Sequence, residues 1–570
     1  MTRMTSSEAF VETMVAHGVT DVFGIVGSAY MDALDIFEPA GIRFWSVAHE
    51  QAAAHMADGY SRVSNRHGVC IAQNGPGITN FVTAIAAAYW AHSPVVCITP
   101  QTGSMGLGKG GFQETDQMPI FENITKYQVQ INRHERMAEH MHRAFTLSMT
   151  ERGPVQVNIP RDLFYGEADY DIQQPLVIER AAGGGASLDA AAAALASAEF
   201  PVILAGGGVI MSEGTQPLIA LAEHMKAPVV TSYLHNDAFP ASHDLACGPL
   251  GYQGSKSAMR VIAQADVILA LGSRLGPFGT LPQHGIEYWP ENARVIQVDI
   301  DHRMLGLVQE VEVAVHGDAA AAAHELLHRL QGMEVRSRSN ADARLFEVAK
   351  QKDAWTTELT EWSSSDELPM APRRALGELE MAMPDGAMVT TDIGNICSVA
   401  NSYLNFDRPN SMFAAMMWGN CGYAFPTAMG AKIAAPERPA IAYVGDGAWG
   451  MSMAEIMTCV RENIPVVAVV FNNGQWGAEK KNQVDFYDDR YVGTNLENPS
   501  FAKISEAMGG HGIKVAKPDE VGDALREAVA SERPTVLEIM VSQELGEPFR
   551  RDALNLPVRV LEKYEKFGTQ

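Results

Sequence analysis

The sequence predicts an α/β protein built from three doubly wound parallel-sheet domains. Short, nearly continuous apolar runs alternate with helical periodicity along three separate blocks of the chain, which is the pattern of parallel α/β architecture. A chain of 570 residues supports several domains, and 46% hydrophobic against 19% charged residues is enough apolar material for large cores. We expect domains at residues 1–165, 186–332 and 370–570.

The first block begins with a helix. Thr5 is placed to cap this helix, and Glu8 follows at the spacing that completes a capping box. The apolar runs "GVCIAQ" and "PVVCITP" predict strands of the same domain. A polar and glycine-rich stretch, "GEADYDIQQPLVIERAAGGGAS", then predicts a linker to the second block.

The second block contains the strand candidates "PVILAGGG", "DVILALGS" and "RVIQVDID", each followed by a loop or a helical stretch. The pattern fades near "RLQGMEVRSRSNADAR", after which a charged helical segment and "WSSSDELPMAPR" lead into the third block. That block begins near Pro372 and contains the polar motifs considered below.

Charge and cysteine content exclude several classes of protein. The formal charge of −25 argues against nucleic acid or an anionic membrane as a partner, because both reward clustered Lys and Arg. The six cysteines show no CxxC spacing, so neither a zinc site nor a disulfide framework is expected. The N-terminus has acidic residues where a signal peptide would be apolar, and no apolar run approaches the ~18 residues of a membrane span. We therefore expect a cytoplasmic protein.

Polar residues follow two neighbouring strands of the third block. Asp446 comes directly after the apolar run "AIAYV", and Asn473 comes directly after "PVVAVVF". The residues between these runs have helical spacing, so the unit is predicted to be strand, helix, strand. A right-handed crossover makes the two strands parallel, which places Asp446 and Asn473 at the same edge of the sheet. Ligands bind at this edge in open α/β sheets.

The residue types at this edge favour a hard cation. A carboxylate and an amide oxygen, with a backbone carbonyl nearby, form part of an oxygen shell that Mg²⁺ accepts. Gly445 and Gly447 let the backbone approach a ligand closely, and the helix that follows favours an anion at its N-terminus. Taken singly, Asp-Gly and Asn-Asn are also ordinary turn sequences.

The spacing "GDG", 24 residues, "NN" resembles the cofactor motif of the thiamine-diphosphate-dependent acetolactate synthase and pyruvate decarboxylase superfamily. The stretches "HEQAAAHMADGYSR" and "QNGPGITN" resemble the pyrimidine-binding domain of the same superfamily. The resemblance implies a pyrimidine-binding, a central and a diphosphate-binding domain, with thiamine diphosphate and Mg²⁺ as cofactors. It also implies that Asp446, Asn473 and the carbonyl of Gln475 hold the metal ion.

The resemblance further implies that Glu50 is catalytic. In the superfamily a glutamate at this place hydrogen-bonds the aminopyrimidine ring and promotes formation of the thiazolium ylid. Cys421 aligns with the large apolar residue that supports the bent cofactor, a departure from the usual Met, Leu or Ile. As a small hydrophobe, a buried thiol can serve there, although a purely structural cysteine is the alternative. The further implied cofactor contacts are Gly75, Pro76, Gly394, Asn395, Gly422, Gly445, Gly447 and Ala448.

Finer stretches resemble the sulfoacetaldehyde acetyltransferases within this superfamily. They span nearly the whole chain and are "AQNGPGITNFVTA", "AYWAHSP", "HNDAFP", "GPLGYQGSKSAM", "LPQHGIEYWP", "QWGAEKKN", "DDRYVGT" and "QELGEPFRRDA". The implied reaction converts sulfoacetaldehyde and inorganic phosphate into acetyl phosphate and sulfite. The implied alternative is an acetolactate synthase-like carboligase acting on pyruvate, and a remote one is a catalytically silent scaffold or binding protein.

A site for sulfonate and phosphate needs local anion-binding groups in this acidic protein. The alternative for the lysines and for Arg550 and Arg551 is a solvated surface charge. An ion pair at the domain surface would explain Arg274 equally well, and a polar loop position would explain Gln113. The candidates are Gly27, Ser28, Gln113, Arg274, Lys480 and Lys481, with Arg550 and Arg551 as further sources of positive charge. In the resembling family two subunits share each active site, which implies a homodimer, or a tetramer of paired dimers.

Overall fold

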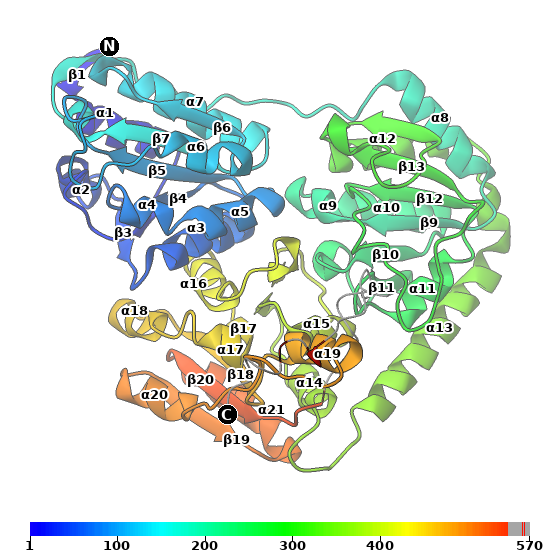
Figure 1. Ribbon diagram of the computed structural model, residues 1–570. Coiled ribbons are helices and arrows are strands. Elements are labelled where there is room, and N and C mark those ends of the chain that lie inside the picture. Colours follow the sequence, from blue (N-terminus) through cyan, green and yellow to red (C-terminus); the bar gives the residue numbers. More distant parts are fainter. Residues whose placement is uncertain (545, 547–560, 563, 565–570) are drawn as a thin grey trace.

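The computed structural model describes residues 1–544, 546, 561, 562 and 564. Its described part contains three six-stranded sheets, each parallel throughout and flanked by helices. Figure 1 shows the first and third sheets stacked on one side of the molecule and the central sheet beside them. The predicted fold class is therefore confirmed.

The first sheet has the strand order β3-β2-β4-β5-β7-β6. Its strands are β2 (Asp21–Gly24), β3 (Arg43–Ser46), β4 (Gly68–Ile71), β5 (Val95–Gln101), β6 (Tyr127–Gln130) and β7 (Val155–Pro160). Its helices are α1 (Ser6–Ala16), α2 (Met31–Phe37), α3 (Glu50–Ser64), α4 (Pro76–Thr79), α5 (Val82–Trp90), α6 (Met118–Phe121) and α7 (Met137–Thr150). The predicted capping box is present, since Thr5 accepts the N–H of Glu8 at 3.1 Å while the Glu8 carboxylate accepts that of Thr5 at 2.6 Å.

The predicted linker after the first sheet contains an additional strand. Strand β8 (Glu167–Tyr170) pairs antiparallel with β1 (Thr2–Thr5), so the chain end and the start of the linker form a small ribbon. The linker prediction did not include this strand. Both strands are short and polar, and their order depends on pairing between segments far apart in sequence, which local patterns do not report.

The central sheet has the order β11-β10-β9-β12-β13-β14. Its strands are β9 (Pro201–Ala205), β10 (Val229–Ser232), β11 (Ala246–Leu250), β12 (Val267–Leu271), β13 (Arg294–Asp299) and β14 (Val313–His316). Its helices are α8 (Gly185–Ser197), α9 (Gly207–Met211), α10 (Thr215–Met225), α11 (Lys256–Ile262) and α12 (Ala319–Gln331). The charged segment predicted to lead to the third block is helix α13 (Ala341–Trp362), which runs along the central domain toward the third sheet (Figure 1).

The third sheet has the order β16-β15-β17-β18-β20-β19. Its strands are β15 (Met388–Thr391), β16 (Met412–Ala414), β17 (Ala440–Gly445), β18 (Val466–Asn472), β19 (His511–Val515) and β20 (Thr535–Met540). Its helices are α14 (Pro372–Met381), α15 (Asn395–Val399), α16 (Ala424–Ala434), α17 (Asp446–Trp449), α18 (Glu455–Glu462), α19 (Gly477–Phe486), α20 (Phe501–Ala507) and α21 (Pro518–Ala530).

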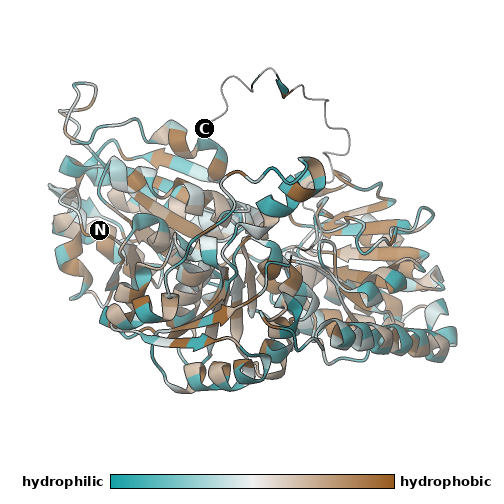
Figure 2. Cartoon of the chain, turned by 60° about the horizontal axis from the view of Figure 1, so that its bottom comes forward, coloured by the Kyte–Doolittle hydropathy of each residue, from teal (hydrophilic) through white to brown (hydrophobic). Residues whose placement is uncertain are grey.

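Burial on both faces explains the continuous apolar strands. All seven residues of β18 and all five of β12 are buried, as expected for parallel strands covered by helices on both sides. In Figure 2 the strands are mostly hydrophobic, while the surrounding helices alternate hydrophobic and hydrophilic residues. Among the described residues, no helix has both the length and the hydropathy needed to cross a membrane.

Helices α3 and α16 join the first and third domains. They approach so closely that a Cβ at Gly59 would lie 2.1 Å from the carbonyl oxygen of Thr427, and one at Gly430 would lie 2.0 Å from that of Met56. Only glycine fits at these two crossings. This contact fixes the start of α3, where Glu50 lies, relative to the loops of the third sheet.

Candidate functional site

Asp446 lies at the carboxyl end of β17, beside the end of β18. Its side chain is 3% exposed. One carboxylate oxygen accepts the backbone N–H groups of Asn473 at 3.1 Å and Gly474 at 2.7 Å, and the other accepts that of Gly447 at 2.9 Å. Burial raises the pKa of Asp446, and these donors oppose the rise. The structure thus brings Asp446 and Asn473 together at one sheet edge, as the predicted crossover requires.

Three other polar side chains lie close together near the loop that follows β18. A Cβ placed on Gly477 would lie 3.8 Å from Gln475 Nε2, 3.9 Å from Asn395 Cβ and 4.0 Å from Asn473 Nδ2. Asn395 is the first residue of α15, so it reaches the loop from the neighbouring strand β15. Gln475 Oε1 and Asn395 Nδ2 are buried and have no hydrogen-bond partner among the residues that the structure describes. Unpaired buried polar atoms on converging loops are typical of a site that takes a polar ligand.

The glycines of these loops leave room for such a ligand. Gly394 has φ 141°, and no atom of the described residues outside the immediate chain neighbours lies within 4 Å of the position of a Cβ there or at Gly445. Ala448 is buried within α17, whose N-terminus carries Asp446 and Gly447. The described residues contain no cluster of His, Cys, Asp or Glu side chains able to hold a metal ion without help. A cation here would take one carboxylate with amide and carbonyl oxygens, and phosphate oxygens would complete its shell, which fits a magnesium diphosphate.

The segment around Cys421 is fixed by a buried carboxylate. Asp392 is 1% exposed and accepts the N–H groups of Gly422 at 3.1 Å and Ala424 at 3.4 Å. Burial raises the pKa of Asp392 to about 7. Cys421 is half-buried, and burial raises the pKa of its thiol to about 12, so the sulfur stays protonated and apolar at neutral pH. All six cysteines of the chain are free.

Glu50 begins helix α3 in the first domain. Its carboxylate accepts a hydrogen bond from Asn80 Nδ2 at 2.9 Å, and its other oxygen lies 3.2 Å from the position of a Cβ on Gly77. Gly75, with φ 70°, and Pro76 form the turn that enters α4. Glu50 and the "QNGPG" turn, which sequence reasoning linked only through the family resemblance, therefore lie against each other.

A set of glutamines extends this first-domain surface. Gln73 Nε2 donates to Gln113 Oε1 at 2.9 Å, and Gln73 Oε1 accepts the N–H of Ala29 at 3.1 Å. Gly27 packs directly against Gln73, and the next residue, Ser28, is exposed. The structure thus groups Gly27, Ser28 and Gln113 in one cluster. Gln73 was not among the predicted site residues.

The two groups of site residues lie on different domains of the chain. In the described part of the molecule, no hydrogen bond or ion pair joins Glu50 or Gln113 to Asp446, Asn473 or Gln475. The hydrogen bonds between these domains run elsewhere, for example from Arg62 to Tyr423 at 2.9 Å. The Glu50 group therefore belongs to the first domain and the Asp446 group to the third.

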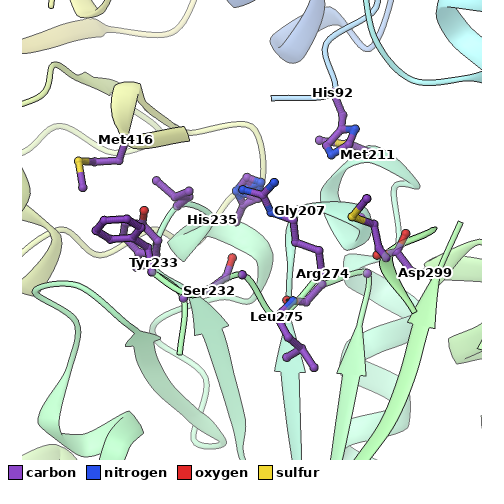
Figure 3. A pocket seen from close by; sticks show the side chains of 18 of the residues that line it. His92, Gly207, Met211, Ser232, Tyr233, His235, Arg274, Leu275, Asp299 and Met416 are labelled. Atoms are coloured by element: carbon purple, nitrogen blue, oxygen red, sulfur yellow. The ribbon is translucent and has the colours of Figure 1, made fainter. Parts of the chain in front are cut away.

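A cavity of about 580 Å³ lies between the central domain and the cofactor-type loops of the third domain. Gly394, Asn395 and Glu479 line one side, and Arg274 enters from the end of β12. Figure 3 shows the Arg274 side chain extending toward His235, with Asp299 to one side. Among the described residues the guanidinium has no hydrogen-bond or ion-pair partner, and it lies 4.9 Å from the ring centre of Trp90.

The predicted lysines have partners of their own. Lys481 pairs with Asp485 one turn later on α19 at 2.5 Å, and Lys480 donates to Asn495 at 3.0 Å. Arg550 and Arg551, predicted as further positive charges, lie outside the described residues.

Sequence reasoning missed two residues that hydrogen-bond to the predicted site residues or to their neighbours. Asn498 donates to the Asp446 carboxylate at 2.8 Å from 52 residues downstream, and Glu455 contacts the segment before Glu50. Neither lies in a motif with a characteristic spacing, so no local signal distinguishes it.

Comparison with known proteins gives full-length matches. Residues 4–120, 188–326 and 392–539 match family profiles described as the N-terminal TPP binding, central and C-terminal TPP binding domains of thiamine pyrophosphate enzymes. The chain is 60% identical to a "Sulfoacetaldehyde acetyltransferase" of Castellaniella defragrans (99% of this chain, 98% of the relative). It is 58% identical to a protein of the same name from Alcaligenes xylosoxydans xylosoxydans (99% and 98%). It is 32% identical to a "Probable acetolactate synthase large subunit" of Methanocaldococcus jannaschii (99% and 97%).

Proposed function

Because the chain belongs to the thiamine pyrophosphate enzyme family, we propose that it is a sulfoacetaldehyde acetyltransferase. It would convert sulfoacetaldehyde and hydrogen phosphate into acetyl phosphate, sulfite and a proton, with cleavage of the carbon–sulfur bond and formation of a carbonyl–oxygen bond to phosphate. The observation that carries this proposal is 60% identity over nearly the whole of both chains to a relative of that name. The grouping of Asp446 with Asn473 and of Glu50 with the Gly75 turn supports a working cofactor site.

In this proposal the third domain holds thiamine diphosphate through Mg²⁺. Asp446, Asn473 and the Gln475 carbonyl would be the metal ligands, and the N-termini of α15 and α17 would receive the diphosphate. Gly394, Asn395, Gly445, Gly447 and Ala448 belong to these two helix starts. Asp446, the single acidic ligand, already accepts several backbone N–H groups. This suits a site in which phosphate oxygens supply the remaining negative charge around the cation.

When bound, thiamine diphosphate would supply a nucleophilic carbon for the aldehyde and an electron sink for the negative charge that develops. The protein must hold and move protons at the aminopyrimidine, and Glu50 is the carboxylate placed to do so. Asn80, which donates to Glu50, would orient that carboxylate. Cys421 and Gly422, held by Asp392, would support the cofactor ring from the third domain.

Arg274 is the best supported of the anion-binding candidates. In the described residues its guanidinium has a ring contact with Trp90 but no hydrogen-bond or ion-pair partner, and it extends into a cavity that reaches Asn395. A partly desolvated guanidinium suits tetrahedral anions such as sulfonate, sulfite and phosphate. Gly27, Ser28 and Gln113 would contact the substrate from the first-domain half-site. Lys480 and Lys481 remain candidates, although the pairing of Lys481 with Asp485 leaves less of its charge for a ligand.

Two subunits would complete each active site. One chain has its Glu50 half-site and its Asp446 half-site on different domains, without a hydrogen bond between them in the described residues. A homodimer in which each first domain faces the partner's third domain would join them. Co-expressed Glu50→Gln and Asp446→Ala chains should then regain activity, because one site of each heterodimer contains neither change. Verified heterodimers no more active than the two parents would reject this arrangement.

The decisive assay combines the protein with sulfoacetaldehyde, phosphate, thiamine diphosphate and Mg²⁺. Sulfite and acetyl phosphate should form in equal amounts, and omission of phosphate should stop acetyl phosphate formation. Pyruvate in place of sulfoacetaldehyde should give little acetolactate. Acetolactate formation without sulfite release would support the carboligase instead, and absence of both products with bound cofactor would support a silent scaffold.

A further inference from the structure

Glu455 is a buried carboxylate that crosses from the third domain to the start of helix α3. It is the first residue of α18 and is 1% exposed. Its two oxygens accept the backbone N–H of Ala48 at 3.1 Å and of His49 at 3.0 Å, and the Thr458 hydroxyl donates to it at 2.7 Å. Ala48 and His49 directly precede Glu50.

We propose that Glu455 is a positioning residue for Glu50, an inference that rests on the proposed function. His49 caps α3, and its ring nitrogen accepts the N–H of Gln51 at 3.2 Å, so Glu50 is the first residue of the helix. The direction in which the Glu50 side chain points depends on the backbone conformation of the two preceding residues. Glu455 holds both of their N–H groups with one rigidly packed carboxylate.

Helix dipoles and hydrogen-bond donors offset part of the cost of burying a charge at Glu455. The carboxylate lies at the N-terminus of its own helix α18 and next to that of α3, and both helix dipoles stabilise a negative charge. Burial raises the pKa of Glu455, while the Thr458 hydroxyl and the two N–H donors oppose this. A charged acceptor makes shorter and stronger hydrogen bonds than a neutral amide, so it fixes the backbone more firmly.

Attachment of the two domains does not depend on this contact. Helices α3 and α16 touch at Gly59 and Gly430, and Arg62 donates to Tyr423 at 2.9 Å. Glu462, on the same helix as Glu455, also crosses the boundary and pairs with Arg43 at 3.1 Å. Loss of Glu455 should therefore leave the domains docked and release only the residues that lead into Glu50.

The test is a double-mutant cycle between Glu455→Gln and Glu50→Gln, with Glu462→Gln as the matched control. Glutamine has the size of Glu455 but offers one acceptor oxygen for two N–H groups. We expect kcat at saturating cofactor to fall about 10- to 100-fold in Glu455→Gln, as small misplacements of catalytic groups do. The KM for sulfoacetaldehyde should change less than about threefold, because Glu455 touches no substrate group. Glu462→Gln should keep its kcat.

The cycle separates positioning from general destabilisation. If Glu455 acts through Glu50, adding Glu455→Gln to Glu50→Gln should lower kcat no further. Equal fold losses in both backgrounds, or a kcat within threefold of wild type in Glu455→Gln alone, would overturn the proposal. Normal turnover by Glu50→Gln would instead refute the catalytic assignment of Glu50, which is a failure of the proposed function.

Hydrogen exchange supplies a readout without activity. In the purified protein, amide exchange at Ala48 and His49 should be faster in Glu455→Gln than in wild type, while Glu462→Gln should leave it unchanged. Unchanged exchange would also overturn the proposal. If Glu455→Gln does not fold, Glu455→Asp, which keeps the charge but is one methylene shorter, takes its place in both measurements.

Discussion

Replacement of Asp446 by alanine tests the proposed metal site most directly. The Asp446 carboxylate accepts four hydrogen bonds of 2.7–3.1 Å, from Gly447, Asn473, Gly474 and Asn498. Alanine would leave all four donors without this acceptor, at about 1–3 kcal/mol for each one that stays buried. Water can enter the vacated space and satisfy several of them, so we expect a loss of about 2–4 kcal/mol in the free energy of unfolding.

The effect on cofactor binding should be similar in free energy to the effect on stability. Asp446 is the single carboxylate of the proposed shell, so its removal takes the only protein charge from the cation. We expect the Mg²⁺ concentration for half-saturation with thiamine diphosphate to rise about 100-fold, which corresponds to ~2.8 kcal/mol. Asp446→Asn keeps the shape but not the charge and should show most of this loss.

Tryptophan fluorescence offers the assay. Trp449 ends α17, and a Cβ on Gly447 would lie 2.8 Å from the ring of Trp476, so indole rings lie beside the loop on both sides. Titration of the apoprotein with Mg²⁺ at fixed cofactor should change this fluorescence. Asp485→Asn, which removes a carboxylate from neighbouring α19, should titrate like wild type. An unchanged midpoint in Asp446→Ala would refute the assignment of Asp446 as a ligand.

Three further outcomes are expected. Glu50→Gln should keep the cofactor bound but lower sulfite release by about two or more orders of magnitude, and near-normal release would contradict its role. Arg274→Gln should raise the KM for phosphate or sulfoacetaldehyde more than it lowers kcat, whereas unchanged KM values for both would remove Arg274 from the anion site. Burial raises the pKa of Glu380 to about 7, and its Oε2 has no hydrogen-bond partner in the described part of the chain. Because the folded-state pKa of Glu380 is raised, the wild-type protein loses stability as pH rises from about 4 to 7. The melting temperature of Glu380→Gln should therefore rise relative to that of wild type between pH 5 and 8. A difference in melting temperature that does not depend on pH would contradict this.

The sheet edge with Asp446 was predictable because it depends on local pattern and chain topology. Apolar runs define the strands, the crossover rule makes them parallel, and the polar residue after each strand must then lie at the same edge. The hydrogen bond from the Asn473 backbone to Asp446 agrees with that reasoning. The placement of Glu50 beside Gly77 was reached only through the family resemblance, since no periodicity brings α3 and α4 together.

Contacts between distant segments were not predictable in the same way. Asn498 reaches Asp446 from an irregular loop, and its Asn-Pro sequence reads as a turn. Glu455 looks like an ordinary acidic residue in the first turn of a helix. Its second function, as acceptor for Ala48 and His49, depends on domain packing through Gly59 and Gly430. Conversely, Lys481 and Asp485 are spaced as a helical ion pair, so their pairing could have been foreseen.

The short stretch from Asp446 to Glu455 links the two half-sites of one chain. Asp446, at the start of this segment, is the first residue of α17, and Glu455, at the end of the segment, is the first residue of α18. A shift of the segment therefore moves both the proposed metal ligand and the carboxylate that binds the two residues before Glu50. If each active site takes Glu50 from one subunit and Asp446 from the other, these two residues of one chain serve different sites. Occupation of one site by cofactor would then affect the Glu50 of the second site through this segment and the hydrogen bonds of Glu455 to Ala48 and His49. The segment is therefore where coupling between paired sites should be sought, and the Glu455 variants provide the means.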